Sequence, residues 1–146
     1  MAAQRTWIRH RMLAGGAALL AFGTLAACSS TPPTPTSEDE EAYLRGYVEA
    51  TMASARAAGL SPENSVDETL ANLTPSTRED GIDLAMADCE TLRNDPQGAA
   101  DEIRLGRAMA ADGDLPVDPL DATILAVKHL CPDLEPQLDE ARAALE

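Results

Sequence analysis

The feature that most constrains the fold is an uncharged run over residues 12–27, which ends at Cys28. Three arginines and no acidic residue precede this run. A basic start, an apolar segment and small residues, in this order, are typical of a secretory signal peptide. The sixteen uncharged residues fall short of the roughly 20 that span a hydrocarbon core. We therefore expect residues 1–27 to be a cleaved signal peptide that takes no part in the folded domain.

The residues Leu25-Ala26-Ala27-Cys28 resemble the lipobox of bacterial lipoproteins. That resemblance implies that the thiol of Cys28 receives a diacylglyceryl group, with acyl chains such as palmitate, and that cleavage falls between Ala27 and Cys28. Two acyl chains hold a protein firmly at a membrane, because each buried methylene contributes about 0.8 kcal/mol. The alternative is an ordinary signal cut near Ala27, with Cys28 left as a thiol. The pattern favours a lipid anchor on the extracytoplasmic face of the cell membrane.

A segment rich in serine, threonine and proline follows the anchor. Residues 29–37 favour an extended polyproline conformation and offer little to bury. At about 3.1 Å per residue, this segment would hold a domain roughly 30 Å from the membrane. We predict a lipidated cysteine and linker over 28–37 and one helical domain over 38–146, because that length supports one core and not two.

The exported part is strongly acidic. Its formal net charge is −17, since the whole chain carries −14 and residues 1–27 hold three arginines and no acid. Such a surface repels phosphate backbones, which excludes nucleic acid as a partner and favours an envelope protein with a basic surface. Only two aromatic residues, Tyr43 and Tyr47, remain after the signal. A stacking platform for sugars or bases is therefore disfavoured.

Helix start and stop signals recur along the domain, and no run shows the alternation of a half-buried strand. We predict an all-α fold of about five helices. The first should begin at Ser37, capped reciprocally by Glu40, and end at Gly59. Further helices are expected over 65–72, with a second capping box of Ser65 and Glu68, and over 76–94. Two begin at Asp95-Pro96 and Asp118-Pro119, and a last segment over 136–145 either docks or frays.

Apolar residues on these segments recur at helical spacing, which predicts inward faces. On the first helix the face is Tyr43, Leu44, Tyr47, Val48, Thr51, Ala55 and Ala58, which favours core over a ligand site. On the third it is Ile82, Ala85, Met86, Cys89 and Leu92, and on the fifth Leu120, Ile124, Val127 and Cys131. Cys89 and Cys131 should therefore point inward.

Cys89 and Cys131 form an even pair in an exported domain, the setting in which disulfides persist. We predict that they are bonded. In the chain-entropy treatment, closing the loop between them stabilises the domain by roughly 4 kcal/mol. The alternative is two separately buried thiols.

Chemistry-bearing residues are few after the signal, with one histidine, His129, and one lysine, Lys128. We place His129 at the surface near a helix carboxyl end, where positive charge is favourable. Asp112, Asp114, Asp118 and Asp121 suggest a calcium loop, but the spacing is not that of an EF-hand, and a solvated capped loop is favoured. No nucleophile motif, phosphate loop or zinc signature is recognisable, so we expect neither enzymatic activity nor a cofactor.

The cysteine contexts Ala-Met-Ala-Asp-Cys89-Glu-Thr-Leu and Ala-Val-Lys-His-Leu-Cys131-Pro132 resemble a family of small secreted or lipid-anchored actinobacterial proteins, the domain of unknown function 732. The resemblance covers roughly the last 70 residues and implies a short helical domain with this cysteine pair in the cell envelope. It implies no activity. We expect a non-enzymatic interaction or accessory module, or alternatively a carrier of a small hydrophobic ligand or lipid.

Overall fold

The structure, a computed structural model, describes residues 33–110 and 116–146. Within those ranges the chain forms helices and no strand. The helices are α1 (Ser37–Ala57), α2 (Val66–Asn72), α3 (Pro75–Asn94), α4 (Pro96–Ala110), α5 (Pro119–His129) and α6 (Glu135–Leu145), with a short 3-10 turn, η1 (Pro132–Leu134), before α6. The predicted all-α fold is confirmed. Both the short helix and the final segment form, which makes six α-helices over the described residues.

Several predictions fall on other parts of the chain. The signal peptide over 1–27, its cleavage after Ala27, the lipidation of Cys28 and the linker up to residue 32 lie outside the described residues. None of the described helices is long and apolar enough to cross a membrane.

The cap of α1 differs from the prediction by one residue. Thr36, rather than Ser37, is the N-cap, and its hydroxyl accepts the N–H of Asp39 at 3.3 Å while the Asp39 carboxylate accepts the N–H of Thr36 at 2.8 Å. Both Thr36 and Ser37 have an acid three residues later, so the capping pattern fits two registers and cannot choose between them.

The carboxyl end of α1 lies where the sequence predicts it. Gly59 has φ of +80°, and its N–H donates to Arg56 while that of Leu60 donates to Ala55. This pair of bonds is a Schellman motif, which requires the left-handed backbone that glycine adopts without strain. The chain can therefore leave α1 and turn back toward α2.

The other caps follow the sequence closely. Ser65 and Glu68 form the predicted capping box of α2. Thr74 caps α3, which begins at Pro75, one residue earlier than expected. The Asp95 carboxylate accepts the N–H of Gly98 at 2.9 Å at the start of α4, and Asp118 caps α5.

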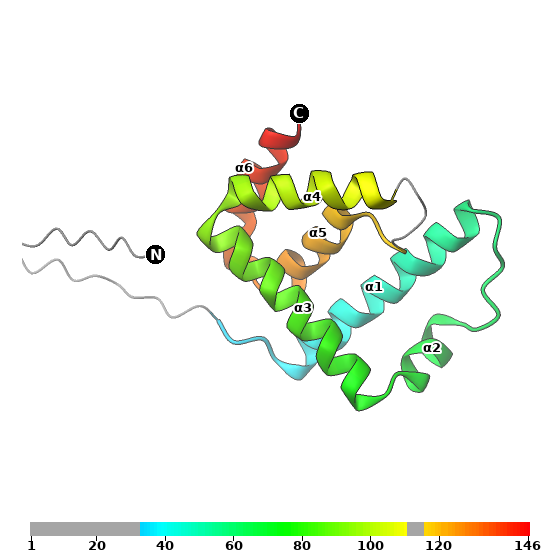
Figure 1. The fold of residues 1–146 in the computed structure, drawn as a ribbon. Helices are drawn as coiled ribbons and strands as arrows, with labels where there is room; N and C mark the ends of the chain where they lie inside the picture. The colour runs from blue at the N-terminus through cyan, green and yellow to red at the C-terminus, as the bar shows by residue number, and fades with distance from the viewer. Residues whose placement is uncertain (1–32, 111–115) are drawn as a thin grey trace, which may run out of the picture. The chain divides into compact units, whose positions relative to one another are not determined.

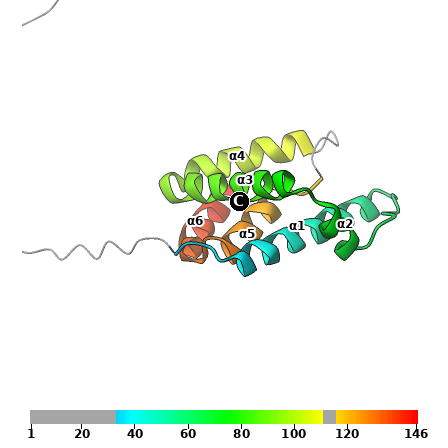
Figure 2. The ribbon, with the colours of Figure 1, turned by 90° about the horizontal axis from the view of Figure 1, so that it is seen from below.

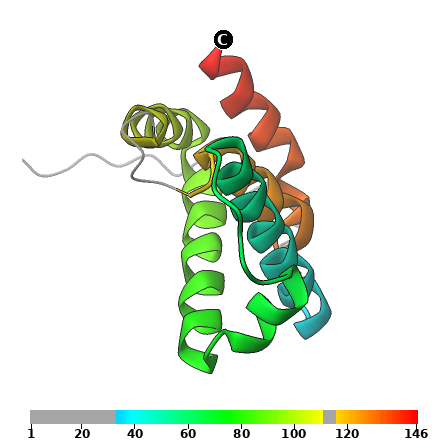
Figure 3. The ribbon, with the colours of Figure 1, turned by 90° about the vertical axis from the view of Figure 1, so that its right-hand side faces the viewer.

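The helices of the domain lie in two layers (Figure 2). One layer holds α3 and α4, and the other holds α1, α5 and α6. α1 packs on α5 and α2, α3 packs on α4 and α5, and α6 packs on α4. Figure 1 shows the two long helices α1 and α3 crossing at an angle, and Figure 3 shows α2 near one end of the pair. That arrangement leaves the space between α1 and α3 to be filled by side chains alone.

The core is aliphatic and is joined by a disulfide. Cys89 of α3 and Cys131, just after α5, are bonded with a Cα–Cα distance of 6.3 Å. Their residues are 1% and 2% exposed, so both point inward as predicted. The core around them includes Leu44, Val48, Met52, Leu70, Leu92, Val127, Leu130, Leu134 and Leu138. α6 docks through Leu138 and Ala141, both buried, so the final segment does not fray.

Candidate functional site

A hollow of about 500 Å³ lies between α1, α2 and α3. We call it the larger hollow. Tyr43 and Tyr47 contribute to its wall from α1. Its other apolar lining residues are Leu44, Val48, Met52, Leu73 and Leu84. A few polar groups, among them Thr51 and Asp80, also line it. Mostly apolar walls with a few polar groups, at this size, are typical of small-molecule sites.

The larger hollow exists because the packing residues are small there. Gly81 faces it from the middle of α3, and a Cβ added at Gly81 would meet only Cδ2 of Leu44, at 3.5 Å. The chain has no phenylalanine or tryptophan after residue 27 that could fill the space. The side chains of α1 and α3 therefore leave part of the space between the two helices unfilled.

Two arginines connect the helices around the larger hollow. Arg78 of α3 donates to the Glu41 carboxylate of α1 at 2.6 Å and to the carbonyl oxygen of Leu70 in α2 at 2.8 Å. Arg45 of α1 pairs with Asp67 of α2 at 2.8 Å. Each ion pair is partly exposed and is worth little alone, but together they fix α2 against the other two helices.

A second hollow, of about 260 Å³, lies between α1, α3, α4 and α5. We call it the smaller hollow. It shares Tyr43, Tyr47 and Leu84 with the larger one, so the two hollows adjoin. Two acids line it: Asp88 of α3 and Glu102 of α4. Burial, and then the negative charge of Glu102, raise the pKa of Asp88 to about 6.

Tyr43 stands at the junction of the two hollows. Its residue is only 5% exposed, yet no hydrogen bond joins its hydroxyl to any residue that the structure describes. Burial raises the pKa of that hydroxyl, and the nearby Tyr47 and Asp88 raise it further. The Tyr43 and Tyr47 rings lie with centroids 6.2 Å apart. The hydroxyl oxygen of Tyr43 itself is not fully buried, because among the described residues the fully buried side-chain oxygen without a partner is Oε1 of Gln137.

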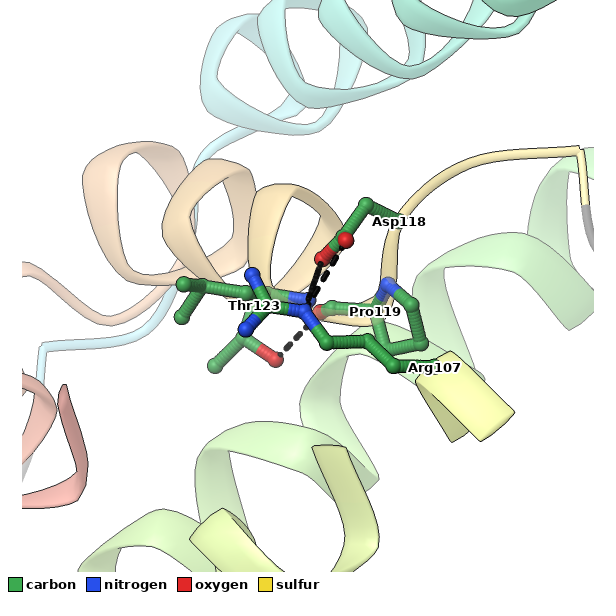
Figure 4. Close-up of polar contacts among 5 residues, drawn as sticks. Arg107, Asp118, Pro119 and Thr123 are labelled. Carbon is green, nitrogen blue, oxygen red and sulfur yellow. Dashed lines mark hydrogen bonds and ion pairs between the residues drawn. The ribbon is translucent and has the colours of Figure 1, made fainter. Parts of the chain in front are cut away.

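A polar cluster lies at the start of α5 (Figure 4), and two of its residues, Pro119 and Thr123, also line the smaller hollow. Nε of Arg107 donates to both carboxylate oxygens of Asp118, at 2.9 and 3.1 Å. Asp118 also accepts the N–H of Leu120 at 2.8 Å, and the hydroxyl of Thr123 donates to the carbonyl of Pro119 at 2.9 Å. The ion pair of Arg107 is therefore with Asp118 and not with either acid of the smaller hollow.

The same cluster bears on the calcium alternative. Asp118 serves as a helix cap and as the partner of Arg107, and Asp121 lies exposed on α5. Asp112 and Asp114 lie outside the described residues. Among the described residues, no group of three or more histidine, cysteine or acidic side chains is placed to hold a metal ion.

His129 lies in the last turn of α5, at the helix end that the sequence predicts. The expected surface position is only partly right, because the residue is half-buried. Burial, and then the charge of Lys128, lower the pKa of His129. The pKa of His129 is thus lowered even though the residue lies at a helix carboxyl end, where a positive charge is ordinarily favourable.

The inward face of α1 was predicted from the sequence to belong to the core. Leu44, Val48 and Met52 are indeed buried, but they also line the larger hollow with Tyr43, Tyr47 and Thr51. One feature of the sequence indicated a hollow here: Gly81, in the middle of a helix, removes side-chain volume from an apolar face. The approach of Asp88 to Glu102 had no local signal, because they belong to different helices.

Comparison with known proteins gives no match: no family model, no curated protein and no solved structure is significantly similar to this chain. The function of the site must therefore be inferred from its own residues.

Proposed function

We propose that this protein is an exported lipoprotein of the cell envelope whose helical domain binds a small apolar molecule in the larger hollow. The observation that carries the proposal is the size and lining of that hollow, about 500 Å³ enclosed by tyrosine and aliphatic side chains of α1, α2 and α3. Pockets of 300 to 1,000 Å³ with such walls suit small ligands. This is the carrier alternative that the sequence left open.

The membrane anchor and the hollow fit one role. The signal peptide and Cys28 predict attachment to the outer face of the cytoplasmic membrane, and the linker lets the domain reach the lipid surface or stand off from it. An apolar molecule is poorly soluble in water, so a protein tethered beside the bilayer can shield it near its source. The lining of the larger hollow includes no histidine, cysteine or lysine, which favours binding over covalent chemistry.

The acidic charge supports a second candidate, recruitment of a basic envelope protein. A net charge of −17 over the 119 residues from Cys28 onward, derived from the whole-chain value of −14, would speed encounter with a cationic surface. This role needs no cavity and is compatible with the first.

The deciding experiment compares ligand retention by two variants of Gly81. The anchored wild-type protein is extracted from membranes, and non-covalently bound molecules are identified by native mass spectrometry and solvent extraction. Gly81→Leu places a bulky side chain in the larger hollow, while Gly81→Ala adds one methyl group. An apolar molecule found on the wild type and the alanine variant, but missing from the leucine variant, supports the carrier. A wild type free of any small molecule, together with a stoichiometric protein partner, favours recruitment.

A further inference from the structure

The smaller hollow holds two acids that lack a cation. Asp88 and Glu102 both line it, and neither forms an ion pair with a described residue. Six arginines of the described residues, Arg107 among them, pair with other carboxylates. Asp88 is half-buried and Glu102 is exposed, so the cost of burial falls on the charged form of Asp88, and a bound cation would offset that cost.

A second observation in the same hollow also indicates a ligand. Tyr43 is 95% buried, since only 5% of its surface is exposed, and its hydroxyl has no hydrogen-bond partner among the described residues. The residue lines both hollows, so a ligand in either one would lie against it. A ligand placed there would supply the missing partner or pack against the ring.

The aromatic rings identify the kind of cation. Tyr43 and Tyr47 stand side by side at the junction, with centroids 6.2 Å apart. Pairs of aromatic rings beside carboxylates recognise amines and quaternary ammonium groups through cation–π attraction. A hard metal ion would need six or more oxygen ligands, and the described residues hold no metal-binding group of acids. The charge that fits is an organic cation.

We propose that the protein binds a cationic amphiphile, a molecule whose amine or quaternary ammonium group lies in the smaller hollow while its apolar part fills the larger one. This inference rests on the proposed carrier function and adds the class of ligand. The shared lining of Tyr43, Tyr47 and Leu84 gives one molecule a continuous path between the two hollows. The strongly acidic surface would also concentrate cations around the domain.

The test uses the protein's own fluorescence. After the signal is removed, Tyr43 and Tyr47 are its only tyrosine or tryptophan residues, so tyrosine emission reports on both hollows directly. The mature lipidated protein, in phosphatidylcholine liposomes at pH 7.5, is titrated with decyltrimethylammonium, decanol or decanoate. These probes share a chain and differ in head-group charge. Binding of the cation should be about tenfold tighter than that of decanol, and decanoate should bind most weakly.

Variants locate the head group. In the double variant Asp88→Asn with Glu102→Gln, the preference for the cation should disappear while decanol still binds. Asp83→Asn is the matched control, because this exposed acid lies on α3 but lines neither hollow. Circular dichroism checks that each variant is helical.

The possible failures are distinguishable. Equal binding of all three probes, or a cation preference that survives in the double variant, would overturn the cationic head-group site and leave the carrier standing. If no probe alters tyrosine emission in the wild type, both this inference and the carrier function are overturned.

Discussion

Arg78 of α3 donates to the carboxylate of Glu41 in α1 at 2.6 Å, and its other amino group reaches the carbonyl oxygen of Leu70 in α2 at 2.8 Å. One planar guanidinium thus connects the three helices that surround the larger hollow. A lysine at the same position could not make both contacts, because its ammonium is a point charge without the fork of an arginine.

Arg78→Lys should therefore lower the free energy of unfolding by about 1 kcal/mol, since it removes a bond to a backbone carbonyl. Urea denaturation followed by circular dichroism measures the change. Arg142→Lys is the control, because among the described residues Arg142 pairs only with Asp139, one turn away on α6. An equal loss in both variants would show that Arg78 does no more than an ordinary surface charge.

Gly81→Ala should stabilise the protein by about 0.5 to 1 kcal/mol. The substitution removes the backbone entropy cost of a helical glycine, and the new Cβ would only touch Leu44, at 3.5 Å. Gly46→Ala on α1 should gain less, because its Cβ would lie 2.8 Å from Cδ2 of Leu125 and that side chain would have to move. Thermal unfolding of the two variants gives the comparison; a larger gain at Gly46 would contradict the existence of free space at Gly81.

Asp88→Asn should stabilise the protein at pH 7.5 and have little effect at pH 4. Burial and the charge of Glu102 raise the pKa of Asp88 from 3.8 to about 6 in the folded protein. An acid with a raised folded pKa destabilises the fold when ionised, and that cost disappears as the pH falls below 6. The neutral amide should thus gain more than about 1 kcal/mol at pH 7.5. Asp83→Asn, measured by urea denaturation at both pH values, controls for the general loss of acid charge.

The same titration predicts how cation binding depends on pH. Tyr43 and Tyr47 face Asp88 from α1, and Glu102 faces it from α4; the lining residues of α5 carry no charge. Because the pKa of Asp88 is about 6, this carboxylate loses its charge between pH 7.5 and pH 5. The affinity for decyltrimethylammonium should therefore fall at pH 5, while that for decanol should not. A parallel loss for both probes would point to unfolding of the site instead.

Removing the disulfide by Cys89→Ala with Cys131→Ala should cost roughly 4 kcal/mol. This cost is comparable to the whole stability of a small domain, so reduction alone should leave much of the protein unfolded at 37 °C. Urea denaturation with and without reductant measures it. Alkylation of the denatured, unreduced protein is the direct check: labelling at both positions would contradict the bond.

Cys28→Ala should release the protein from membranes, because the thiol is the predicted point of acylation. Fractionation of cells into membrane and soluble parts, followed by immunoblotting, shows where the chain goes. Ser29→Ala keeps Cys28 and should remain with the membrane. A variant that stays bound without Cys28 would contradict the lipid anchor.

The helices could be predicted from sequence because their signals are local. Thr36, Ser65 and Thr74 each bond to a residue three positions on, and Gly59 ends α1 through its own backbone. The register of the first cap was missed because two hydroxyls had equivalent partners. The disulfide was predictable for a different reason, since only two cysteines remained after Cys28 was assigned to lipid.

The candidate site could not be predicted in the same way. Whether the apolar face of α1 packs solidly or borders open space depends on what α3 places opposite it, and that is Gly81. The proximity of Asp88 to Glu102 depends on the way in which α3 and α4 cross. Gly81 itself is visible in the sequence, but the helix that lies opposite it and the approach of Asp88 to Glu102 are long-range relationships that periodicity and capping do not reveal.

The disulfide closes a loop over residues 89–131, which leaves α1, α2 and residues 75–88 of α3 outside the covalent ring. The seven residues of α2 can therefore detach from the domain without straining that ring, at the cost of a few packed side chains, the exposed ion pair of Arg45 with Asp67 and the hydrogen bond from Arg78 to Leu70. Segments with so few contacts exchange their amide hydrogens by sub-global opening, well before the whole protein unfolds. In the proposed carrier, the ligand would thus enter and leave the larger hollow when α2 transiently detaches, while the disulfide still joins α3 to the end of α5.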